Sequence, residues 1–141
     1  MRVFLDTNIL LDVLLNRPQF VNDSEAVILR CEALSAEMFV AWHGLATAYY
    51  LLKRGRTEQA ALVEVDRILV WARVADANDA SARRARALAF GDFEDALQAA
   101  SAEACGAQWI VTRNTGDFGR SQVPAITPQD FLQRFAVPAA L

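Results

Sequence analysis

The sequence predicts a three-layer α/β/α domain with a central, mostly parallel sheet. Short apolar runs suited to buried strands alternate along the chain with segments whose apolar residues recur at helical spacing. Strands that alternate with helices in this way form a parallel sheet that helices cover on both faces. No repeat, low-complexity tract or Pro/Gly-rich linker divides the chain. We therefore expect a single domain over residues 1–141.

The N-terminal half is predicted to contain two strands and three helices. In order, these are a strand at 3–5, a helix at 7–15, a helix that starts at Asp23 or Ser24, a strand at 38–41 and a helix from 43. Asp6 offers a capping side chain to the first helix, and Pro18 stops that helix. In the third helix, apolar residues between Leu45 and Leu52 recur at i, i+3, i+4 and i+7. Gly55 is its candidate C-cap.

The C-terminal half continues the alternation. In order, it is predicted to hold a helix that Thr57 caps, a short strand at 73–75, a helix that Asp79 caps and that ends at Gly91, a helix from 92 to 106, a strand at 109–112, a short strand at 123–126 and a helix that begins near 128. Asp92 caps the helix that Gly106 ends. Thr127 followed by Pro128 is typical of a helix start, because Pro suits the first helical position. The residues of helix 92–106 expected to face the core are Phe93, Ala96, Leu97, Ala100 and Ala104.

The composition describes a folded protein and excludes several classes. Apolar residues make up 54% and charged residues 22% of the chain, a balance that excludes a disordered tail. No apolar run approaches the roughly 20 residues of a membrane-spanning helix, and the N-terminus lacks the pattern of a signal peptide. Cys31 and Cys105 are expected to be buried free thiols of a cytoplasmic protein. The 14 Lys and Arg residues against 17 Asp and Glu leave a formal charge of −3, which argues against a protein that coats nucleic acid irrespective of its sequence.

Acidic residues lie near the carboxyl ends of the predicted strands at three separate places in the chain. Asp6 directly follows the first strand, and Asp117 lies in the loop after the strand at 109–112. Asp92 and Asp95 occupy the first turn of the preceding helix, three residues apart, so both can point to the same side. Ligands of open α/β sheets bind beyond the carboxyl ends of the strands, so we expect these acids to converge on one rim. Taken singly, each acid is equally suited to a capping or turn role.

Converging carboxylates repel one another unless a cation lies among them. Lys53 is the only lysine of the chain, so the expected counter-charge is a divalent metal ion. Ligation by carboxylates without His or Cys selects Mg²⁺ or Mn²⁺. Such ions polarise phosphoryl oxygens and activate water for attack on a phosphodiester. Four polar residues beside the acids are suited to orient carboxylates or bound waters: Thr7, Asn8, Thr112 and Asn114.

Two stretches of the chain resemble the PIN domain family. They are Phe4-Leu5-Asp6-Thr7-Asn8, and Asp92-Phe93-Glu94-Asp95-Ala96-Leu97 leading to Trp109-Ile110-Val111-Thr112-Arg113-Asn114-Thr115-Gly116-Asp117-Phe118. The resemblance covers essentially the whole chain and implies a ribonuclease that depends on Mg²⁺ or Mn²⁺. It implies three catalytic, metal-binding acids, which are Asp6, Asp95 and Asp117. It also implies three supporting polar groups, which are Asn8, Thr112 and Asn114. Many bacterial members are VapC-type toxins, so it also implies an RNA substrate, a cognate antitoxin and a homodimer.

The sequence departs from the family pattern at Thr47. The family commonly places a Glu in the helix after the second strand, and Thr47 occupies that position here. Asp92, three residues before Asp95, is the candidate replacement for the missing carboxylate. The departure also motivates an alternative function, a catalytically impaired PIN-fold module that binds nucleic acid or protein.

Several other residues have competing interpretations. Arg113 is suited both to bind a substrate phosphate and to neutralise the acidic cluster, and both interpretations stay open. His43 is expected to be a satisfied or exposed histidine, because no Ser or Cys partner accompanies it. The tyrosine pair Tyr49 and Tyr50 is expected to be mostly core and helix-interface material, although an exposed Tyr50 could stack on a base. The basic residues Arg83, Arg84 and Arg86 are expected to form a solvated helix face, with contact to an RNA backbone as the alternative. A phosphoacceptor domain also places acids at strand ends. It requires a lysine beside the carboxylate, whereas Lys53 lies about 12 Å or more beyond the start of its helix.

Overall fold

The centre of the molecule is a five-stranded sheet in the order β3-β2-β1-β4-β5. The computed structural model describes residues 1–138. The strands are β1 (Arg2–Leu5), β2 (Glu37–Val40), β3 (Ala72–Val74), β4 (Trp109–Val111) and β5 (Ala125–Ile126). In the central strand, Phe4 is in register with Phe39 of β2 and Ile110 of β4. All four pairings are parallel, which confirms the predicted sheet.

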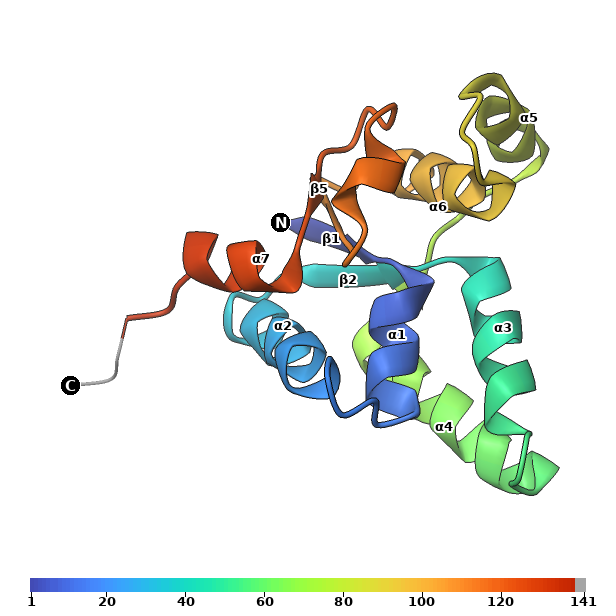
Figure 1. Cartoon of the computed structure of the whole chain (residues 1–141), viewed down its shortest axis with the longest axis vertical. Coiled ribbons are helices and arrows are strands. Elements are labelled where there is room, and N and C mark those ends of the chain that lie inside the picture. Colours follow the sequence, from blue (N-terminus) through green and yellow to red (C-terminus); the bar gives the residue numbers. More distant parts are fainter. Residues whose placement is uncertain (139–141) are drawn as a thin grey trace.

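Helices cover both faces of the sheet (Figure 1). They are α1 (Thr7–Leu14), α2 (Val21–Ala33), α3 (Trp42–Leu52), α4 (Glu58–Trp71), α5 (Asp79–Ala87), α6 (Phe93–Ala104) and α7 (Pro128–Arg134), with a 3₁₀ helix η1 (Thr115–Phe118). In Figure 1, α5 and α6 lie on one side of the strands, and α1, α2, α3 and α4 lie on the other. The three-layer α/β/α class predicted from the sequence is therefore confirmed.

The alternation of side chains along β1 divides the core in two. Val3 and Leu5 belong to a buried cluster with residues of α1, α2 and α7. Phe4, which points to the opposite face, belongs to a second cluster with Ala99 and Ala102 of α6. Successive side chains of a strand point to opposite faces, so an uninterrupted apolar run is what a strand covered on both sides requires.

Several helix boundaries differ from those expected. Helix α2 begins at Val21, before Asp23 and Ser24, and the preceding Phe20 makes no side-chain capping bond. Helix α3 ends at Leu52, and Gly55 takes a φ of 76° in the turn that follows. The buried face of α6 also differs from the expected one. Phe93 is 52% exposed and Ala104 is exposed, although both were expected to face the core. The helix turns Gln98, Ala99 and Ala102 toward the sheet instead.

Helix α5 starts one residue earlier and ends four residues earlier than the sequence predicts. Asn78 caps it, accepting from the Ser81 backbone N–H at 3.3 Å, so Asp79 is its first residue and not its cap. The helix ends at Ala87 and not at Gly91, because Ala89 takes a φ of 53° and leaves the right-handed region. Residues 88–92 therefore form a loop that leads into α6.

Both cysteines are buried and free, as expected. In residues 1–138, no helix is both long and apolar enough to cross a membrane. The carboxyl ends of the parallel strands lie at one edge of the sheet, where α1 follows β1 and α3 follows β2. This edge carries the polar residues described next.

Candidate functional site

Asp6 lies at the carboxyl end of the central strand and is only 2% exposed. Its two carboxylate oxygens are held from different elements. The Gln98 Nε2 of α6 donates to Oδ1 at 2.6 Å, and the Thr112 hydroxyl, just after β4, donates to Oδ2 at 2.7 Å. Burial raises the pKa of Asp6 above its usual value, while these two hydrogen bonds oppose the rise. Oδ2, which accepts the one hydrogen bond from Thr112, keeps a lone pair available for a further ligand.

Gln98 is the residue of this site that sequence reasoning missed. Its side-chain oxygen accepts from the backbone N–H and the hydroxyl of Thr7, at 2.9 and 3.1 Å, which orients the amide nitrogen toward Asp6. The same nitrogen donates to the Glu94 carboxylate at 3.1 Å. The signal was present in the spacing, because Gln98 follows Glu94 by four residues and Asp95 by three and so shares their face of the helix.

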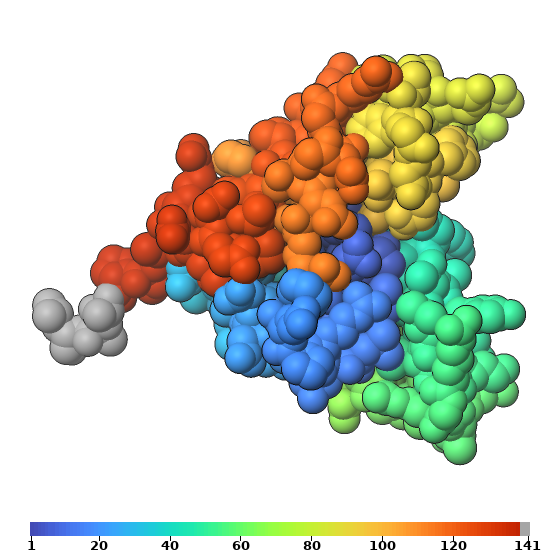
Figure 2. Space-filling model, in the orientation of Figure 1, coloured from blue at the N-terminus to red at the C-terminus, as the bar shows by residue number. Residues whose placement is uncertain are grey.

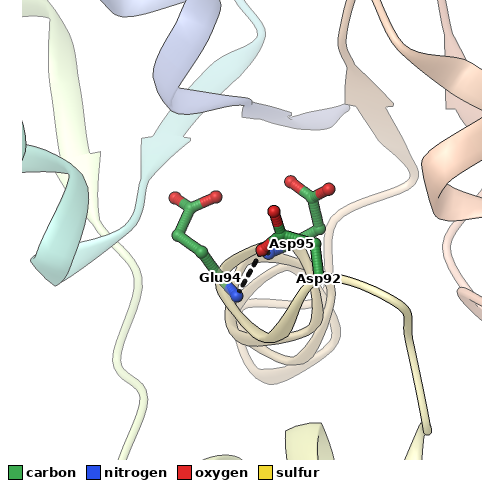
Figure 3. A group of neighbouring side chains, drawn as sticks. All are labelled: Asp92, Glu94 and Asp95. Atoms are coloured by element: carbon green, nitrogen blue, oxygen red, sulfur yellow. Dashed lines mark hydrogen bonds between the residues drawn. The ribbon is translucent and has the colours of Figure 1, made fainter.

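Three acids gather at the start of α6. Figure 3 shows the carboxylates of Asp92, Glu94 and Asp95 at the N-terminal end of the helix. Within residues 1–138, they are the one group of three such side chains whose ligand atoms all lie within 4.8 Å of one another. Asp92 caps α6 as expected, since its Oδ1 accepts from the backbone N–H groups of Glu94 at 2.8 Å and Asp95 at 3.3 Å.

Asp95 is the electrostatic centre of the site. Partial burial raises the pKa of Asp95 to about 7, and repulsion from four neighbouring carboxylates adds to the rise. These neighbours are Asp92, Asp6, Glu94 and Asp117. The acids that were expected to converge from three parts of the chain are therefore within electrostatic reach of one another. Asp6 and Asp117 lie outside the tight group of α6, whereas Glu94, which was not among the expected residues, lies within it.

This pKa predicts a pH-dependent stability. The carboxyl of Asp95 has a higher pKa in the folded chain than in the unfolded chain, so its contribution to stability is complete below about pH 4 and is lost as the pH rises toward 7. Asp95→Asn replaces the carboxyl with an amide that does not ionise, so it removes this loss of stability at high pH. In EDTA at pH 8 we expect the variant to be about 1–2 kcal/mol more stable than the wild type, a figure discounted for partial exposure. The gain should shrink toward pH 5.

Urea unfolding of both proteins between pH 5 and pH 8 measures this effect. Asp66→Asn, at an exposed acid of α4, is the matched control, and its effect on the free energy of unfolding should not change with pH. A stability difference between Asp95→Asn and wild type that stays constant over this pH range would contradict the assigned pKa.

The loop after β4 carries the remaining expected residues. Thr112, which holds Asp6, also accepts from the Asn114 backbone N–H at 3.1 Å, and the short helix η1 then presents Asp117 at the surface. Asp117, Asp92 and Asp95 line the same cavity. On the other side of Asp6, the Asn8 backbone N–H points to Oδ1 at 3.5 Å.

Arg113 lies against α1 and α2 and forms its ion pair away from the acidic rim. Its guanidinium donates to both carboxylate oxygens of Asp12, at 3.0 and 3.2 Å, and stacks 3.8 Å from the centre of the Phe20 ring. Asp12 has no exposed surface and accepts in addition from Arg17 and Ser24. The Arg113–Asp12 pair thus ties the loop that carries Asp117 to the first helix.

Helix α3 contributes no carboxylate at the position where the family has one. Thr47 is exposed, and its hydroxyl donates to the His43 carbonyl of its own helix at 3.1 Å. The acid nearest to this helix comes from α6 instead, since Glu94 Oε1 lies 3.2 Å from His43 Nε2. His43 is therefore a satisfied histidine, as expected, and its partner is one of the acids of the site.

The other polar features lie apart from the acids. Lys53 is at the far end of α3, where it sits over the Tyr49 ring. Two of the three basic residues of α5 are paired, Arg83 with Asp79 and Arg84 with Glu103, which agrees with a solvated helix face. In the tyrosine pair, Tyr49 is partly buried, whereas Tyr50 is 73% exposed, the alternative that the sequence left open for it.

Comparisons with known proteins agree with this geometry. Residues 2–116 match the sequence model of a protein family that is described as the PIN domain. No significant match was found among curated proteins. Several solved structures share the fold, among them these three. VapBC2 from Rickettsia felis, bound to a DNA fragment from its promoter, has 19% identity over 90% of this chain and 98% of its own, with a TM-score of 0.66. VapBC-1 from nontypeable Haemophilus influenzae has 17% identity, coverage of 92% and 99%, and a TM-score of 0.68. FitAcB from Neisseria gonorrhoeae has 19% identity, coverage of 90% and 98%, and a TM-score of 0.62.

Proposed function

The chain belongs to the PIN domain family, and we propose that it is a nuclease that cleaves RNA phosphodiesters with Mg²⁺ or Mn²⁺. The observation that carries this proposal is a set of converging carboxylates that lack a basic partner. Within residues 1–138, Asp6, Asp92, Asp95 and Asp117 form no ion pair with Lys or Arg. Burial and, after it, repulsion from these carboxylates raise the pKa of Asp95, and a bound cation would relieve the repulsion.

The donor set fits a hard divalent cation. All the candidate ligands are carboxylate oxygens, which suit Mg²⁺ and Mn²⁺ and disfavour zinc. Asp6, Asp95 and Asp117 would hold the ion, which supplies a polarised phosphoryl oxygen and an activated water. Thr112 and Gln98 hold the carboxylate of Asp6 in one orientation.

We propose Glu94, ahead of Asp92, as the acid that replaces the carboxylate missing at Thr47. One oxygen of Asp92 already accepts two backbone N–H groups as a helix cap. The carboxylate of Glu94 caps no backbone N–H and hydrogen-bonds to the side chains of His43 and Gln98. Glu94 also lies against α3, the helix that carries the acid elsewhere in the family.

Calorimetric titration with Mn²⁺ tests this ligand set. We expect the wild type to bind at submillimolar concentration, Glu94→Gln to weaken binding about tenfold, and Thr47→Glu to strengthen it. Glu25→Gln, at an exposed acid of α2, is the control that should leave the affinity unchanged. An affinity that Glu94→Gln leaves unchanged would remove Glu94 from the ligand set.

The titration also decides between the two candidate functions. Because α3 offers a threonine where the family has an acid, the alternative is a PIN-fold module that binds nucleic acid or protein without catalysis. The absence of Mn²⁺ binding at millimolar concentration, together with RNA binding or partner binding, would favour that alternative. Cleavage of single-stranded RNA by the wild type in Mg²⁺, abolished by EDTA, would favour the nuclease.

We further propose that the chain is a cytoplasmic, homodimeric toxin of a toxin–antitoxin pair. The support is family membership together with the fold shared with VapBC2, VapBC-1 and FitAcB. A cognate antitoxin would be expected to cover the acidic rim and to place an Arg or Lys among the carboxylates. Co-purification of the chain with the product of a gene immediately upstream, followed by an assay of inhibition, tests this part of the proposal.

A further inference from the structure

One cavity adjoins the acidic rim and extends beyond it. It has a volume of about 800 Å³ and lies between the loop that precedes α6 and the segment that follows β4. The acids Asp92, Asp95 and Asp117 line it, and so do Phe90 and Arg120. In Figure 2, the segment after β4 (orange) lies beside the loop and the start of α6 (yellow).

Arg120 is the one cationic side chain among the residues that line this cavity. Its Nη1 donates to the carbonyl of Ala89, which also lines the cavity, at 2.7 Å, and this bond orients the guanidinium. Arginine has five N–H donors in a rigid fork, so this bond leaves further donors for a second acceptor. A planar fork that is already held in place loses little freedom when it binds a phosphate.

Glycines leave the walls of the cavity without side chains. A Cβ atom added at Gly91 or at Gly116 would meet no other atom within 4 Å. Neither residue has a φ in the left-handed region, so the backbone conformation does not require glycine at these positions. Bare backbone along a cavity instead allows a ligand to approach closely.

Phe90 contributes an aromatic ring to the wall of the cavity. The Phe90 ring packs edge-to-face against the buried Phe118, with 6.2 Å between the ring centres. This contact holds Phe90 in place beside the cavity. Aromatic side chains next to a cation are the usual combination by which proteins bind single-stranded nucleic acid, because the ring contacts a base and the cation contacts the backbone.

We propose that this cavity binds the nucleotide next to the scissile phosphate of a single-stranded RNA, with Arg120 on its phosphate and Phe90 against its base. The inference rests on the proposed nuclease function and adds to it a binding site for the substrate outside the acids. Charge supports this occupant. The carboxylates repel a neighbouring phosphate of the same strand, and Arg120, which lines the same cavity, offsets that repulsion.

Fluorescence anisotropy with a labelled single-stranded RNA oligonucleotide tests the inference. The measurements use the full chain carrying Asp6→Asn, in Mg²⁺, so that the RNA stays intact. We expect Arg120→Gln to raise the Kd about tenfold. We also expect it to lower the slope of log K against log salt by about 0.7, the value for one lost phosphate contact on a single strand. Arg120→Lys should keep the salt slope but weaken binding, because it keeps the charge and loses the fork.

Gly116→Gln probes the cavity without removing a charge. It should raise the Kd about tenfold with an unchanged salt slope, because the added side chain occupies the part of the cavity in which the nucleotide would bind. Arg67→Gln, at an exposed arginine of α4, is the control and should alter neither quantity. If the wild type cleaves RNA but Arg120→Gln and Gly116→Gln bind it as tightly as the parent, the inference fails and the proposed function stands. If the wild type neither binds nor cleaves RNA, both fail.

Discussion

Replacing either Asp6 or Asp95 with Asn should lower the Mg²⁺-stimulated cleavage of single-stranded RNA by more than about a hundredfold. Each substitution keeps the shape of the side chain and removes the charge that would hold the metal ion. Asp6 is the more sensitive position, because its carboxylate is buried and oriented by Gln98 and Thr112. Losing one ligand or one preorganised charge of such a site typically costs two orders of magnitude or more.

A gel assay of a labelled oligonucleotide, with and without EDTA, measures the loss. Circular dichroism should show that both variants stay folded, and Asp95→Asn should be the more stable of the two in the absence of metal. Asp66→Asn on α4 serves as the control that keeps full activity. Cleavage that persists unchanged in highly purified Asp6→Asn and Asp95→Asn proteins would remove these acids from the mechanism.

The second large effect is expected at Asp12, and it concerns stability. Asp12→Ala should lower the free energy of unfolding by about 3–5 kcal/mol. The carboxylate has no exposed surface and accepts from Arg113, Arg17 and Ser24. Its removal leaves a cavity, and it leaves Arg113, which stacks on Phe20, without its ion-pair partner.

Urea denaturation of Asp12→Ala, Arg113→Ala and the double variant measures this effect. The double variant should be less destabilised than the sum of the two single variants, because the second change removes a charge that the first has already left unpaired. The exposed pair of Arg67 and Glu64 is the matched comparison, and its removal should cost less than about 1 kcal/mol. A loss below about 1 kcal/mol for Asp12→Ala would contradict the role given to this network.

The layer order and the strands were predictable from the sequence because they depend on local pattern. Apolar runs alternate with helical spacing, and such a pattern has few arrangements other than a covered parallel sheet. Helix ends were less predictable. The end of α5 depends on Ala89 adopting a left-handed conformation, which an alanine does only where its surroundings impose it. No local signal marks such a residue.

The convergence of the acids on one rim also followed from topology alone. Asp6, Asp95 and Asp117 each lie beside the carboxyl end of a strand or the start of the helix that returns to it, so a parallel sheet must bring them to the same edge. Their electrostatic coupling in the structure agrees with that expectation. Their roles as metal ligands remain proposals.

The sequence by itself determined the fold class, the caps at Asp92 and Thr127, and the edge of the sheet at which chemistry can occur. Only the tertiary structure decided which side chains touch there. It turned Gln98 inward to hold Asp6, set Glu94 against α3 in place of an acid at Thr47, and paired Arg113 with Asp12. The reason is that periodicity along a chain specifies only which face of an element a residue occupies. A contact between side chains depends on how two elements pack against each other. Here the residues that meet, Gln98 with Asp6 and Arg113 with Asp12, are about 100 residues apart in sequence.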